Sequence, residues 1–169
     1  MNARRRLAAL GMLSLFVGGT CLGAPENERE SLRGLTGVSV RIERLSDSAR
    51  RGGLDEQAIR TDVEQKLRQA GIQVLTAGQI TAEPGSPVLY IHINARAPWG
   101  STNYAVNTIV ALLQGAVASR NDSLRLREVK TWDVGYLTTV SRANLPQVRK
   151  TVSDLVDEFI GDWRAANPK

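Results

Sequence analysis

The apolar positions between residues 37 and 75 change their spacing twice. A strand with one buried face is predicted first, because apolar residues alternate with polar ones at Val38, Val40 and Ile42. A helix is predicted next, because apolar residues recur every three or four positions at Ile59, Val63, Leu67 and Ala70. Gly71 follows the last of these positions and favours a helix end, and residues 72–75 return to an extended pattern. The first unit is therefore predicted to be strand, helix, strand.

Residues 88–94 form the clearest predicted strand. One of its faces carries Leu89, Ile91 and Ile93, and the other carries Tyr90, His92 and Asn94. Residues 104–118 suit a buried helix or a long strand, and we predict a strand because this range lies between two strand patterns. Residues 126–137 predict the returning strand of a hairpin. The chain then ends in an amphipathic helix, whose apolar stripe is Val148, Val152, Leu155, Val156, Phe159, Ile160 and Trp163.

Together these elements predict an α+β fold in the order strand, helix, four strands, helix. Two helices packed on one face of a mainly antiparallel sheet of about five strands would cover both helical stripes and the buried side of each strand. We assign this single α+β domain to residues 37–169. The preceding range 24–36 is charged and nearly devoid of apolar residues, so we expect a flexible lead-in there.

Residues 1–23 have the three-part pattern of a secretory signal peptide. An arginine run at 4–6 precedes an apolar run over residues 7–17, and small residues follow. The apolar run is about half of the roughly 20 residues that a membrane-spanning helix needs. We therefore expect a removable leader and a mature chain that begins at Ala24, exported to the periplasm or secreted.

Cys21 leaves a second interpretation of the same segment open. A cysteine at the end of a leader is the lipidation site of bacterial lipoproteins, but Gly18 and Thr20 depart from the residues usual there. Lipidation of Cys21 would make the protein an outer-membrane lipoprotein that acts as an assembly factor. Only in that case would we expect a membrane among its partners. Cys21 is the only cysteine, so no intramolecular disulfide is available.

The leader also accounts for most of the positive charge. The whole chain has 22 Lys and Arg residues against 17 Asp and Glu residues, a formal net charge of +5. Three of the arginines lie in the leader, so 19 basic residues remain against 17 acidic ones and the mature charge is +2. Proteins that bind nucleic acid through its phosphates carry a much larger basic surplus. We therefore expect no nucleic acid among the partners.

The run from Asp62 to Leu75, followed by the strand at 88–94 and the closing amphipathic helix, resembles small uncharacterised secreted or periplasmic proteins of bacteria. The element order is also similar to that of envelope domains such as the TolB amino-terminal domain. This resemblance implies the fold and an envelope location. It includes no diagnostic motif, so it transfers no functional residue to this chain.

His92 is the only histidine and therefore the main candidate for acid–base chemistry near neutral pH. The sequence places no serine and acid around it, so we interpret it first as an exposed strand residue and second as the site of a small secreted hydrolase. One histidine and no cysteine in the mature chain cannot build an ordinary zinc site, and no phosphate-binding glycine motif occurs. We predict no catalytic residue, no metal and no cofactor.

The polar face of the predicted sheet is the best candidate for binding. Aromatic residues with a hydrogen-bonding tip are common at protein interfaces. We therefore group polar residues of the 88–94 strand with two hairpin aromatics as a possible interaction face: Tyr90, His92, Asn94, Trp132 and Tyr136. The leading hypothesis is a non-enzymatic binding or accessory module of the bacterial cell envelope. Its partner would be an envelope protein or a second copy of the chain.

Overall fold

A computed structural model describes residues 25–98 and 100–168. The strands are β1 (Gly37–Ile42), β2 (Gln73–Val74), β3 (Val88–Arg96), β4 (Asn103–Ala118) and β5 (Asn121–Ser141). The helices are α1 (Glu26–Glu30), α2 (Asp47–Arg51), α3 (Glu56–Ala70), α4 (Ala77–Ile80) and α5 (Val148–Ala166), and a short 3₁₀ helix at Arg142–Gln147 leads into α5. The predicted α+β class is confirmed, and residues 104–118 lie in a strand as expected.

The strands form one mixed sheet in the order β2-β1-β3-β4-β5. β1 is parallel to both of its neighbours, whereas β3, β4 and β5 are joined as antiparallel pairs. The expectation of a mainly antiparallel sheet is therefore mostly right. The parallel pairs follow from the connections, since α3 crosses from β1 to β2 and returns the chain in the same direction.

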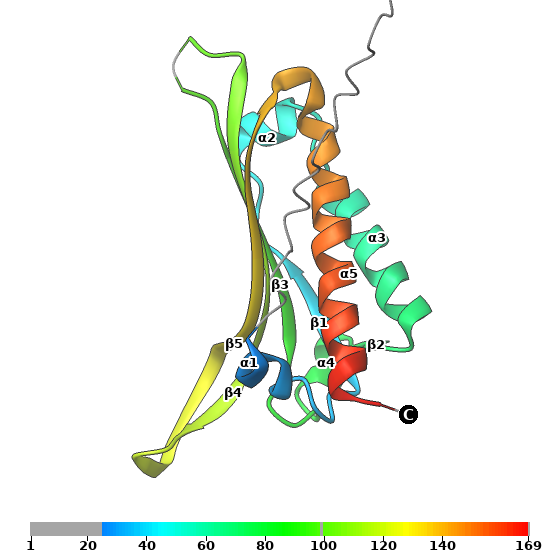
Figure 1. The fold of residues 1–169 in the computed structure, drawn as a ribbon, viewed down its shortest axis with the longest axis vertical. Helices are drawn as coiled ribbons and strands as arrows, with labels where there is room; N and C mark the ends of the chain where they lie inside the picture. The colour runs from blue at the N-terminus through cyan, green and yellow to red at the C-terminus, as the bar shows by residue number, and fades with distance from the viewer. Residues whose placement is uncertain (1–24, 99, 169) are drawn as a thin grey trace, which may run out of the picture.

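The two long helices lie together on one face of the sheet, which we call the covered face (Figure 1). α3 buries Ile59, Val63 and Leu67, and these positions belong to the same core cluster as the apolar stripe of α5. The ring of Phe159 on α5 meets the ring of Trp132 on β5 edge to face, with centroids 5.2 Å apart. The predicted apolar stripes are thus the surfaces that build the core.

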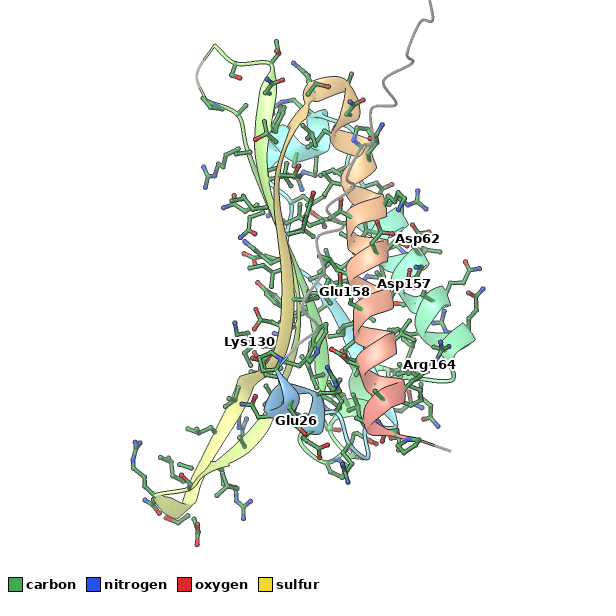
Figure 2. All side chains as sticks on the ribbon, viewed as in Figure 1. Glu26, Asp62, Lys130, Asp157, Glu158 and Arg164 are labelled. Carbon is green, nitrogen blue, oxygen red and sulfur yellow. The ribbon has the colours of Figure 1, made fainter. Side chains whose placement is uncertain are left out.

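Local sequence explains where α3 begins and ends. Asp55 precedes the helix, and its carboxylate accepts hydrogen bonds from the backbone N–H groups of Gln57 and Ala58 at 2.8 and 3.3 Å. Gly71 ends the helix in the left-handed conformation at φ 88°, which glycine adopts without steric cost. Asp62 lies on α3 (Figure 2), and Arg149 of α5 bonds to it, with Nη2 and Oδ1 2.6 Å apart.

The expectation of a flexible lead-in before β1 is wrong for residues 25–36. This segment forms α1 and a turn, and Leu32 within it has 0% of its surface exposed. The end of α5 holds the segment: the side-chain amide of Asn167 donates to the Leu32 carbonyl at 2.9 Å and accepts from the Gly34 N–H at 2.7 Å. The charged residues around Leu32 concealed this contact in the sequence, because two leucines alone have no recognisable period.

No helix within residues 25–98 and 100–168 is long and apolar enough to cross a membrane. The expected signal peptide and Cys21 lie outside the residues that the structure describes. Both therefore remain sequence-based predictions.

Candidate functional site

The second face of the sheet, which we call the open face, has neither long helix on it (Figure 1). Strand register places side chains on this face in rows across β1, β3 and β4. One row contains Ser39, Val88 and Leu113, and the next contains Arg41, Tyr90 and Ala111. Both hairpin ends of the sheet curve away from the helices, so the open face is concave along its length (Figure 1).

A hollow of about 310 Å³ lies in the middle of the open face. Three apolar residues of β4 line it, namely Ile109, Ala111 and Leu113. Its polar lining comes from Glu43 just after β1, from Tyr90 and His92 on β3, and from Lys130 on β5. The hollow therefore combines an apolar surface with a small set of groups that can donate or accept hydrogen bonds, as binding sites commonly do.

Glu43 holds the two rings of β3 in place. Its Oε2 atom accepts a hydrogen bond from the Tyr90 hydroxyl and lies 2.5 Å from His92 Nδ1. The rings of Tyr90 and His92 are nearly parallel, at 13° to each other, with centroids 6.4 Å apart. One carboxylate thus fixes both rings of this part of the open face, which limits the entropy lost when a ligand binds.

The same contacts shift the pKa values of the Glu43 carboxyl and the Tyr90 hydroxyl. Hydrogen bonds from Tyr90 and then His92 hold the pKa of the Glu43 carboxyl below its usual value of 4.5. Burial, together with the Glu43 carboxylate, raises the pKa of the Tyr90 hydroxyl to about 12. At neutral pH the hollow therefore presents a carboxylate and a protonated phenol.

The chemistry available to His92 is limited. Glu43 occupies Nδ1, an arrangement that orients the ring and leaves Nε2 for a ligand or for proton transfer. The residues that line the hollow include no serine, threonine or cysteine that could act as a nucleophile. Within the described residues, no group of three or more His, Cys, Asp or Glu side chains is placed to hold a metal ion.

A second, larger hollow of about 780 Å³ lies at one end of the open face. It is bounded by α4 on one side and by the base of the β4–β5 hairpin on the other. Arg41 and Glu128 line it and bond twice, at 2.7 and 3.2 Å. This ion pair joins β1 to β5 although β3 and β4 lie between them in the sheet.

A bulge in β5 makes that ion pair possible. Gln114 is opposite Val129 and Ala116 is opposite Leu126, so two residues of β5 oppose the single residue Gly115. One of them is Glu128, which has a positive φ of 52°. Such a bulge bends a strand and increases its twist. Here the bend accompanies the turn of the hairpin end toward the open face (Figure 1).

Beyond the bulge, residues 116–126 form an arm that projects from the body of the protein (Figure 1). Three of its apolar residues are well exposed, namely Val117 at 44%, Leu124 at 38% and Leu126 at 40%. The sequence predicted a hairpin here, with its returning strand at 126–137, but it did not identify the arm as a binding surface. The signal was present in the alternation of leucine and arginine over residues 124–127.

The predicted interaction face is divided between the two sides of the sheet. Tyr90, His92 and Asn94 lie on the open face as expected. The prediction for Trp132 is wrong, because its side chain lies in the core with 0% exposed and its indole N–H donates to Asp162 at 3.0 Å. Tyr136 is 53% exposed, but its register opposite Thr108 places it on the covered side of the sheet. Alternation shows which residues of one strand share a face. Only the register between strands shows whether that face is the covered or the open side of the sheet.

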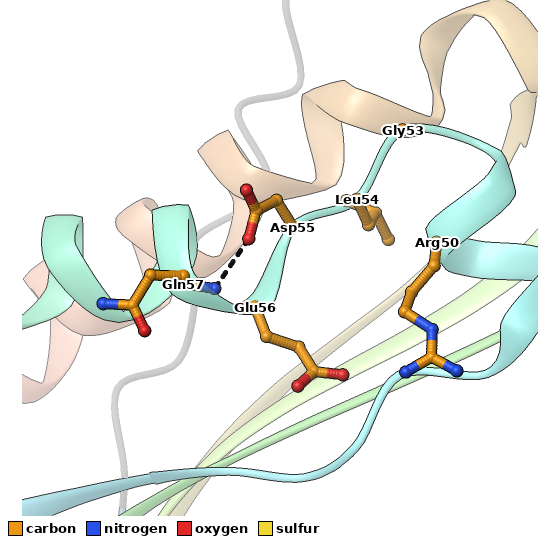
Figure 3. Close-up of a pocket in the computed structure, with 6 residues that line it drawn as sticks. All are labelled: Arg50, Gly53, Leu54, Asp55, Glu56 and Gln57. Carbon is orange, nitrogen blue, oxygen red and sulfur yellow. Dashed lines mark hydrogen bonds between the residues drawn. The ribbon is translucent and has the colours of Figure 1, made fainter.

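A third hollow, of about 540 Å³, lies between α2 and α3, where Arg50 and Asp55 line it (Figure 3). Its acidic groups already serve the fold. Asp55 caps α3, as the dashed bond to Gln57 shows (Figure 3), and Glu56 Oε1 accepts from the Leu45 N–H at 2.7 Å. The acidic residues of this hollow therefore stabilise the start of α3 and the chain before it, and we place the candidate functional site on the open face.

The fold and site define an α+β protein with one sheet face covered by helices and one concave face left open. No protein-family model matches the sequence, and no curated protein matches it. Among solved structures, the chain is similar to a minor lipoprotein from Acinetobacter baumannii, with 12% identity and a TM-score of 0.38, over 78% of this chain and 93% of that chain. A likeness at this level carries no argument about function.

Proposed function

We propose that this chain is a non-enzymatic binding module of the bacterial cell envelope that holds a partner on its open face. The observation that carries the proposal is the central hollow, where an apolar lining from β4 is combined with two rings fixed by Glu43. Protein interfaces are enriched in tyrosine, because its ring is apolar and its hydroxyl can form hydrogen bonds. The predicted leader over residues 1–23 supports the envelope location.

The arm supports a macromolecular partner in preference to a small molecule. The arm, on which Val117 is 44% exposed in the same strand phase as Leu113, lies at one end of the concave face, and the ends of β3 and β4 at Arg96 and Asn103 lie at the other (Figure 1). A small ligand would need only the central hollow. A protein laid along the open face would contact the arm, the hollow and the opposite hairpin together, and exposed apolar side chains on strands suit such a contact.

Site-specific photo-crosslinking in the producing cell tests this proposal. A photoreactive residue in place of Tyr90 samples the open face, and one in place of Lys150, whose side chain is 78% exposed on α5, samples the helical surface. We expect a discrete adduct from position 90 and none from position 150. Equal labelling from both positions, or no adduct at position 90, would contradict the proposal.

A small secreted hydrolase is the second candidate, favoured by the contact between Glu43 and His92 Nδ1. A carboxylate that orients a histidine is part of many hydrolytic sites. A broad substrate screen with the purified protein and with His92→Ala separates the candidates. Turnover that His92→Ala abolishes, while the circular dichroism spectrum stays unchanged, would show that the non-enzymatic proposal is wrong.

A third candidate, an outer-membrane lipoprotein that acts as an assembly factor, depends on Cys21. The intact mass of the protein purified from its natural host tests it directly. A mass that corresponds to a start at Ala24 excludes the lipid. A mass that corresponds to a diacylated or triacylated Cys21 establishes it.

A further inference from the structure

β5 forms one edge of the sheet, and part of that edge has no neighbour among the described residues. α1 covers the edge near its middle: Ser31 donates to the Thr131 carbonyl at 3.1 Å, and Glu28 accepts from the Asp133 N–H at 3.3 Å. Backbone groups along a strand point alternately to its two sides. Because those of Thr131 and Asp133 point away from β4, those of Gly135, Leu137 and Thr139 do so as well.

The free edge lacks the features that usually prevent strands from pairing between molecules. Residues 134–141 read Val-Gly-Tyr-Leu-Thr-Thr-Val-Ser, without charge and without proline. Leu137 in its centre is 73% exposed, the largest exposed fraction among the large hydrophobic residues of the described chain. Proteins normally protect such an edge with lysine, proline, a bulge or a very short strand. The opposite edge of this sheet follows that rule, since β2 has only two residues.

We propose that a second copy of this chain pairs with the free edge, β5 against β5, in antiparallel orientation about a two-fold axis at Leu137. The three residues with free backbone groups are symmetric about that position. Leu137 would therefore oppose Leu137 of the second copy, and Gly135 would oppose Thr139 of the second copy. Each of these opposed pairs exchanges two backbone hydrogen bonds, as alternate pairs of an antiparallel ladder do.

The charges at the ends of the free edge favour this orientation. Asp133 lies just before the segment and Arg142 just after it. In the antiparallel register Asp133 faces Ser141 of the second copy, and Arg142 of that copy is the next residue. Antiparallel pairing thus brings Arg142 of one copy near Asp133 of the other, which already pairs with Lys130 of its own copy at 2.8 Å, whereas a parallel arrangement would place like charges side by side. No charge inside the segment opposes the contact.

The pairing has a consequence for the binding surface. Residues directly opposite one another in a sheet point to the same face. The two five-stranded sheets would therefore join as one sheet, with both helical layers on one side and both open faces on the other. This inference goes beyond the proposed function, because the edge and the open face are separate surfaces. A monomeric protein would overturn the inference and leave the open-face proposal standing.

The oligomeric state of the purified protein, in the form its host produces, is the first test. We expect sedimentation equilibrium to give the mass of a dimer at micromolar concentrations. Leu137→Lys should weaken the dimer at least about tenfold, because it places two positive charges on the axis. Leu124→Lys is the matched control on β5, since Leu124 is exposed outside the free edge, and it should leave the dimer unchanged.

Disulfide trapping tests the register. In a Cys21→Ser background, Leu137→Cys should crosslink under mild oxidation, because opposed residues of an antiparallel pair have Cα atoms about 5.5 Å apart. Thr139→Cys should not crosslink to itself, because the proposed register separates its two copies by more than about 13 Å. A monomer at about 100 μM protein, a dimer that Leu137→Lys does not weaken, or efficient trapping through Thr139→Cys alone would each overturn the proposal.

Discussion

Replacing Leu32 by alanine tests whether the segment before β1 belongs to the folded domain. Leu32 is 0% exposed and is part of the main apolar core. A leucine-to-alanine change at such a position removes buried apolar area and leaves a cavity, at a cost of about 2.7 to 5.0 kcal/mol in well-packed cores. The segment lies near one end of the described chain and can relax into part of that cavity. We therefore expect Leu32→Ala to lower the free energy of unfolding by about 2 to 4 kcal/mol.

Urea denaturation followed by circular dichroism measures this change. The denaturant dependence of the unfolding free energy should stay as in the wild type, so that the midpoint alone moves. Thermal unfolding should shift down by roughly 4 to 16 °C, at about 2 to 4 °C per kcal/mol for a chain of this size. Leu124→Ala is the control, because Leu124 is 38% exposed on the arm, and it should change stability by less than about 0.5 kcal/mol.

Equal effects of the two substitutions would refute this reasoning. A loss below about 1 kcal/mol for Leu32→Ala would mean that its side chain does not contribute as a core residue does. The segment at 25–36 would then be the flexible lead-in that the sequence suggests. A large loss would instead place the start of the folded domain before residue 32, at α1.

Four further predictions concern the open face, the arm and the helix layer. Glu43→Gln should lower the pKa of Tyr90 from about 12 toward 10, measured by ultraviolet titration of the phenol, although burial should keep part of the shift. In the wild type, the stability that Glu43 contributes should be complete above pH 4.5 and should be lost as the pH falls through the lowered pKa of its carboxyl. The stability that Tyr90 contributes should be complete below pH 10 and should be lost between pH 10 and about 12. Arg41→Ala should change global stability by less than about 1 kcal/mol, as for exposed ion pairs, yet speed hydrogen exchange in the arm because Glu128 loses its partner. Gly161→Ala should stabilise α5 by about 0.5 to 1 kcal/mol in urea denaturation, because nothing lies within 4 Å of the added methyl group. Unchanged exchange in the arm, or a destabilised Gly161→Ala protein, would contradict the last two.

Periodicity predicted the elements that cross the core. The alternation at Leu89, Ile91 and Ile93 and the stripe of α5 each describe a surface that must be buried, so pattern and structure agree there. The ambiguous range at 104–118 was predicted correctly for a related reason. It lies between two strands and pairs with both of them.

Register and long-range contacts are the parts that the sequence did not reveal. Trp132 and Tyr136 alternate in the same phase along β5, but only their positions opposite Leu112 and Thr108 show that both lie on the covered side. The partnership of Glu43 with His92 joins positions 49 residues apart, and no local pattern encodes it. Only the β3 members of the predicted interaction face share one side of the sheet, because their grouping needed no knowledge of register.

The charges in the middle of the open face are largely used within the protein itself. Glu43 bonds to Tyr90 and His92, Arg41 bonds to Glu128, and Lys130 lies 2.8 Å from Asp133. Paired charges of opposite sign produce little long-range field, so attraction over distance would contribute little to the approach of a partner. Recognition would then depend on the apolar lining of the hollow and on the fit of a partner to the concave sheet. If two copies pair through β5, this concave surface is repeated on one side of a single sheet, and a partner with two equivalent binding segments would gain affinity without any new kind of contact.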